Sequence, residues 1–164
     1  MSVDTLAPIR AALAVIYGAG AATASRSERR AAERTLLGLR SAEPSTAMNA
    51  CVALMQGSDV AASTFAAQNI AHLCRFREPD ATWPSALLGL LGAAVVAGHS
   101  KPVLTQLSLG VCALAARRRA WAAHELVGVV CQQLHAVGPG ASAVGLVAAL
   151  RLLALLPEEL GSDR

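Results

Sequence analysis

Apolar residues recur at intervals of three and four positions through most of the chain. In a helix, successive residues are about 100° apart, and at this spacing the apolar residues of positions 62–75 lie on one broad face. They are Ala62, Ala66, Ala67, Ile70, Leu73 and Cys74. A narrow polar stripe of the same stretch contains Thr64, Gln68, His72 and Arg75. The pattern predicts an amphipathic helix with one buried side.

The same period returns about forty residues later in the chain. The apolar positions of this second stretch follow one another at spacings of four, four and three, and two further residues widen the face; they are Val103, Leu107, Val111 and Leu114, with Leu104 and Ala115. A second helix with a buried side is therefore predicted.

Glycine and proline interruptions divide the chain into short helices that come in pairs. The predicted helix pairs cover about 4–40, 43–77, 80–117 and 119–156, and their second members begin near positions 26, 60, 101 and 141. Ser25 or Ser27 is expected to begin one of these second helices, and Gly57-Ser58-Asp59 to end one helix and cap the next. A period of roughly 35 to 40 residues is typical of a helical-hairpin solenoid. We therefore expect a single helical-repeat segment over residues 1–164.

Composition favours the same fold class. The sequence is 54% hydrophobic but only 3% aromatic, so its core must be built from alanine, leucine and valine, which suit closely packed helices. No sustained alternation of period two points to strands. The two longest apolar stretches, near 86–98 and 144–156, run for about thirteen residues, whereas a membrane span needs roughly 20. We expect an all-α protein without a membrane span or a signal peptide.

The residues that could carry chemistry are dispersed. Four cysteines, Cys51, Cys74, Cys112 and Cys131, are far apart and have apolar neighbours, which favours buried free thiols over disulfides. Cys131 and His135 share a predicted helix face, but two ligands alone make a poor metal site. We expect no catalytic residues, no metal and no cofactor, and hence no enzyme. The net charge of +3 is too small to indicate direct binding of nucleic acid.

Several stretches together resemble a known protein family. They are Tyr17, the segment 30–37, Phe65-Ala66-Ala67-Gln68 followed by Ile70, the segment 103–109 (Val-Leu-Thr-Gln-Leu-Ser-Leu), Trp121, and the segment 156–160 (Leu-Pro-Glu-Glu-Leu). Their order and spacing resemble the amino-terminal segment of importin-β-type nuclear transport receptors, in the branch of transportin-3 (transportin-SR, Mtr10-like) and importin-13. Leu37 and Arg40 stand where the family tends to have tryptophan and glutamine. Because these receptors are several times longer, the chain is expected to correspond to an amino-terminal piece, a truncated gene model or an isolated segment.

The resemblance implies a right-handed α-α superhelix of about four HEAT- or armadillo-like hairpins. It also implies a protein that shuttles between cytoplasm and nucleus and acts in protein import into the nucleus. The implied partners are the GTP-bound form of the small GTPase Ran, protein cargo such as SR-rich splicing factors, and nucleoporins. In the family, Ran binds the concave surface of the first repeats.

Second helices line the inner surface of such an arch, and this placement selects six candidate partner-binding residues. They are Arg30, Arg34, Gln68, His72, Arg75 and Gln106. Each could instead be a solvated side chain, and Gln68 and Gln106 could form hydrogen bonds between helices inside the stack. The alternative function is a generic HEAT/ARM-repeat scaffold that binds another protein and has no role in transport.

Overall fold

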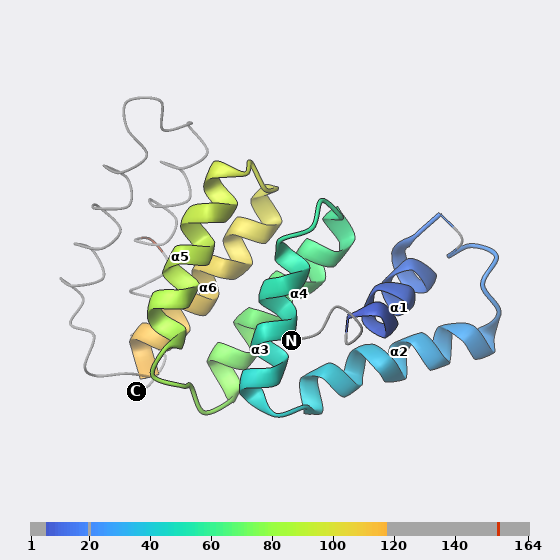
Figure 1. The fold of residues 1–164 in the computed structure, drawn as a ribbon, viewed down its shortest axis with the longest axis horizontal. Coiled ribbons are helices and arrows are strands. Elements are labelled where there is room, and N and C mark those ends of the chain that lie inside the picture. Colours follow the sequence, from blue (N-terminus) through green and yellow to red (C-terminus); the bar gives the residue numbers. More distant parts are fainter. Residues whose placement is uncertain (1–5, 20, 118–153, 155–164) are drawn as a thin grey trace. The chain divides into compact units, whose positions relative to one another are not determined.

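The computed structural model describes residues 6–19, 21–117 and 154, and this part of the chain contains helices and no strand (Figure 1). The helices are α1 (Ala7–Tyr17), α2 (Arg26–Ser41), α3 (Pro44–Met55), α4 (Val60–Phe76), α5 (Trp83–Val96) and α6 (Lys101–Arg117). The predicted all-α class is confirmed. The predicted pair at 119–156, with Trp121, Cys131 and His135, lies outside the described residues except for Ala154.

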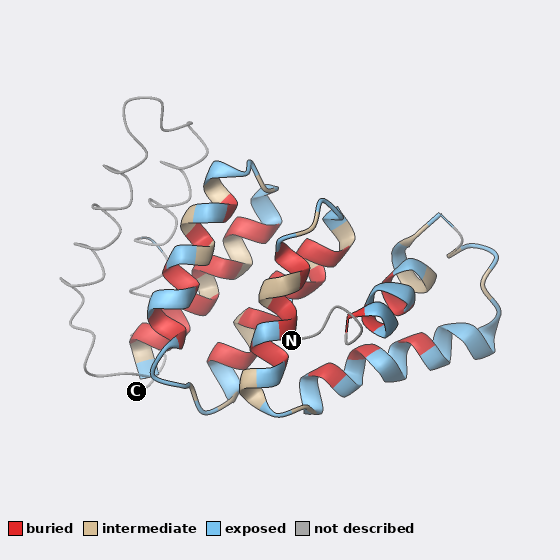
Figure 2. Cartoon of the chain, viewed as in Figure 1, coloured by how far each residue is buried: buried red, intermediate tan, exposed pale blue. Residues whose placement is uncertain are grey.

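The chain forms two compact units, Met1–Asn69 and Ile70–Arg164, and the division falls within α4. In the first unit α1 packs against α2. Each helix contributes a narrow buried face: Ile9, Ala12 and Leu13 from α1, and Ala32, Leu36 and Leu39 from α2. Figure 2 shows the remaining surface of α2 to be almost entirely exposed. In the second unit α5 packs against α6.

Side chains at the helix starts satisfy amide groups that the helices cannot pair internally. Ser25 begins α2 with a capping box: its Oγ accepts from the Glu28 amide at 3.2 Å, and the Glu28 carboxylate accepts from the Ser25 amide at 2.7 Å. Asp59 accepts hydrogen bonds from the amides of Ala61 and Ala62 at the start of α4. Ser25 and Asp59 are therefore helix caps, as their positions in the sequence predict.

Glycines end two of the helices. At the end of α5, Gly98 has a positive φ of 70°, its amide donates to the Val95 carbonyl, and the His99 amide donates to the Ala94 carbonyl. This pair of bonds is a Schellman motif, which requires a left-handed residue and so favours glycine. At the end of α1, a Cβ on Gly18 would lie 2.4 Å from the Ala14 carbonyl oxygen. That close approach explains why this position lacks a side chain.

The predicted buried faces of α4 and α6 are confirmed. All six apolar residues assigned to each face are buried. The second half of α6 is buried on every side, because every residue from Gly110 to Ala115 is buried. A Cβ on Gly110 would lie 3.3 Å from the Leu87 side chain and 3.5 Å from the Ala71 backbone, so this glycine lets α6 approach both α4 and α5.

Three of the four cysteines, Cys51, Cys74 and Cys112, are buried free thiols, as predicted, and Cys131 lies outside the described residues. Burial disfavours the thiolate and raises the pKa of Cys51 to about 12. A thiol in this state is inert, which fits a packing role. In the described ranges, no helix has the combination of length and apolar character that crossing a bilayer requires.

We predict that Glu43→Gln destabilises the protein near neutral pH and does so less in acid. The Glu43 carboxylate accepts from the amides of Ser45 and Thr46, and these bonds lower its pKa from 4.5. A carboxylate with a lowered folded-state pKa stabilises the fold above its unfolded pKa, and the effect disappears as pH falls through the folded value. The melting temperatures of the two proteins should therefore lie closer together at pH 3 than at pH 7. A difference in melting temperature that is the same at both pH values would contradict this account.

Candidate protein-interaction surface

Arginines dominate the outward face of α2. Arg26, Arg30 and Arg34 follow one another at intervals of four residues, so they lie along one side of the helix, and all three are exposed. We call these three residues the arginine stripe. The buried residues Ala32 and Leu36 lie on the opposite side. The packing of α1 against α2 thus directs the stripe, including the candidates Arg30 and Arg34, to solvent.

The polar stripe of α4 carries three more candidates. Gln68 and Arg75 are exposed and His72 is half-buried. The His72 ring lies 4.8 Å from that of Phe76 (centroid to centroid), at an angle of 48°. The sixth candidate, Gln106, lies half-buried on α6. The structure therefore brings Arg30 and Arg34 together on α2, and Gln68, His72 and Arg75 together on α4.

A buried asparagine connects α2 to α4, and the sequence pattern did not single it out. Asn69 is 1% exposed. Its Oδ1 accepts from Arg40 Nε at 2.8 Å, and its Nδ2 donates to the Phe65 carbonyl at 2.7 Å. The sequence feature that could have identified it is an asparagine between the apolar positions of an amphipathic helix, because a buried asparagine needs a hydrogen-bond partner.

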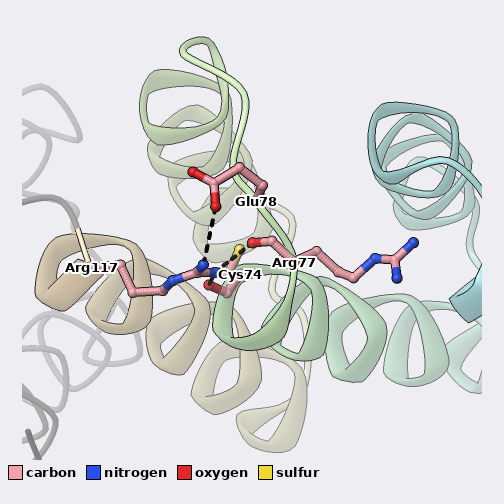
Figure 3. A network of polar contacts seen from close by, with 4 residues as sticks. All are labelled: Cys74, Arg77, Glu78 and Arg117. Carbon is pink, nitrogen blue, oxygen red and sulfur yellow. Dashed lines mark hydrogen bonds and ion pairs between the residues drawn. The ribbon is translucent and has the colours of Figure 1, made fainter.

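Arg117 connects the end of α6 to the end of α4. Its Nη1 donates to the Cys74 carbonyl at 3.2 Å and to the Arg77 carbonyl, and its Nη2 lies 3.6 Å from a Glu78 carboxylate oxygen (Figure 3). The last carbonyls of a helix lack internal partners and carry partial negative charge, so an arginine stabilises them. Because the Glu78 side chain is 92% exposed, that ion pair adds little. Arg117 therefore serves the packing of the second unit.

Two features of the described residues bear on possible chemistry. No group of three or more histidine, cysteine, aspartate or glutamate side chains in the ranges 6–19 and 21–117 is placed to hold a metal ion. Ser63 is buried, its hydroxyl lacks a hydrogen-bond partner, and it lies in the first turn of α4. Exposed polar side chains lie both on helix surfaces and in the connecting segments, for example Arg30 on α2 and Asp59 before α4.

Comparison with known proteins gives no family assignment: no protein family model and no curated protein matches the chain.

Proposed function

We propose that the chain is the amino-terminal segment of an importin-β-type nuclear transport receptor and binds Ran in its GTP-bound form. In this proposal it is not an enzyme. It shuttles between cytoplasm and nucleus and takes part in protein import, with protein cargo and nucleoporins as further partners.

One observation carries the proposal. Two of the stretches that resemble the transport receptors, 65–70 and 103–109, lie in helices that follow a shorter helix and a short loop. In both, the apolar residues are buried except Leu109, which is half-buried, while Gln68 is exposed and Gln106 is half-buried. This combination of packing residues and accessible polar residues is what a repeat protein with a recognition surface requires.

The proposed architecture follows from the same pattern. If α2, α4 and α6 are the second helices of successive HEAT-like hairpins in a right-handed superhelix, their exposed side chains contribute to one inner surface. A stable protein interface buries about 800 Å² on each partner, which is more than one helix offers. Several of the six candidate residues would therefore contact Ran together, and arginine is enriched among residues that dominate binding energy.

The direct test measures binding of the full chain to Ran loaded with a non-hydrolysable GTP analogue or with GDP. We expect binding to the GTP form at least about tenfold tighter, equivalent to about 1.4 kcal/mol. Arg34→Glu should weaken that binding, whereas Arg10→Glu, the same change at an exposed position of α1, should not. Equal affinity for both nucleotide states would contradict the proposal and favour a generic HEAT/ARM-repeat scaffold.

A further inference from the structure

We infer that the arginine stripe is a docking site for an acidic segment of a partner protein, whose carboxylates are spaced one helical turn apart. The inference rests on the proposed function, since Arg30 and Arg34 belong to both, and it specifies the chemistry of the partner surface that these residues contact.

The stripe is an unfavourable arrangement for α2 alone. Like charges four residues apart on a helix repel one another. Arg26, Arg29 and Arg30 also lie in the first turns of α2, where the positive end of the helix dipole disfavours cations. Within residues 21–117, no ion pair joins Arg26, Arg30 or Arg34 to a carboxylate. An anionic partner would relieve all of this repulsion.

The geometry of the stripe is fixed before any partner arrives. The capping box at Ser25 holds the first turn of α2, and the buried residues on its opposite side hold its rotation about the helix axis. Arg34 Nε donates to the Arg30 carbonyl at 3.3 Å, which orients one guanidinium along the helix. From Arg26 to Arg34 the helix rises by about 12 Å, or about 6 Å per four residues. An acidic helix with a carboxylate at every fourth position has the same repeat.

Two observations favour a protein partner over a nucleic acid. Binding of single strands relies on aromatic side chains that stack on bases, and α2 contains none. The helix also carries Glu28 and Glu33, both exposed, which would repel a continuous phosphate backbone. The separate carboxylates of a protein partner can instead each pair with one arginine guanidinium group and lie away from Glu28 and Glu33. Leu37, exposed one turn beyond the stripe, offers an apolar contact that a protein segment can use.

The experiment uses the full chain and a fluorescent helical peptide with glutamate at every fourth position, with fluorescence anisotropy as the readout at low salt. Arg26→Gln/Arg30→Gln should weaken binding about tenfold, because two charge-assisted contacts are lost. The matched control, Arg10→Gln/Lys101→Gln, removes the same charge at exposed positions and should bind as the unaltered chain does. The stripe variant should melt at the same temperature or higher, because repulsion within α2 is reduced.

Three results would overturn the inference: no binding of the peptide, equal weakening by both double variants, or displacement of the peptide by oligouridylate at lower concentrations than by its own unlabelled form. These failures are separable from failure of the proposed function. Ran binding that depends on GTP, with no peptide binding, would remove the inference alone. Peptide binding that requires the stripe, with equal binding of both Ran states, would remove the proposed function alone.

Discussion

Replacing Leu107 with alanine is expected to lower the free energy of unfolding by about 3 kcal/mol, as is usual for a fully buried leucine. Leu107 lies in the middle of α6 and is 0% exposed. The change removes apolar contacts and leaves a cavity, and the surrounding helices can close such a cavity only in part. Chemical denaturation of the full chain, followed by circular dichroism, measures the loss.

The matched control is Leu37→Ala on α2. Leu37 is also a helical leucine but is 57% exposed, so the same change should alter stability by less than about 0.5 kcal/mol. If the two variants lost similar stability, the burial assigned to the predicted apolar face of α6 would be wrong.

Asn69→Ala is expected to cost about 2 kcal/mol, because a buried hydrogen-bonded group is lost and its partners must find others. The substitution removes the acceptor of Arg40 Nε and the donor to the Phe65 carbonyl, and thus the polar link from α2 to α4. Asn49→Ala, at an exposed position of α3, is the control and should be nearly neutral.

A double-mutant cycle with Arg40→Met isolates the bond between the two side chains. We expect a coupling energy of about 1 kcal/mol, in the range measured for residues in direct contact. Stability losses that simply add would show that Arg40 and Asn69 act independently, and would contradict the contact.

The buried faces of α4 and α6 could be predicted because helical periodicity is a local property. Each face is specified by residues within a few turns of one another, and burial of that face decides how the helix packs. The caps at Ser25 and Asp59 are local as well, since their hydrogen-bond partners lie two or three residues away. The same pattern identified Gln68 and Arg75 as exposed.

The polar contacts that join helices could not be predicted in this way. Arg40 and Asn69 are 29 positions apart, and Arg117 reaches carbonyls 40 and 43 positions earlier. Nothing in the period of a helix identifies such a partner. A basic residue at the end of α6 suits the dipole of its own helix, whereas Arg117 completes the end of a different helix, α4.

The exposed end of α5 shows that apolar residues alone do not predict which positions of a helix are buried. Val96 lies in the most apolar helix and continues its run of hydrophobic residues, yet it is 72% exposed. It lies on the side of α5 opposite Leu87, one residue before the C-cap. When a helix has apolar residues on all sides, its sequence does not indicate which side packs against another helix.

The most direct test of the central claim, that exposed side chains of α2 and α4 recognise the GTP form of Ran, is hydrogen–deuterium exchange of the full chain with Ran in each nucleotide state. The account predicts slower amide exchange in Arg26–Ser41 and Val60–Phe76 with the GTP form and no change with the GDP form. Equal protection by both forms, or protection confined to helices other than α2 and α4, would contradict it.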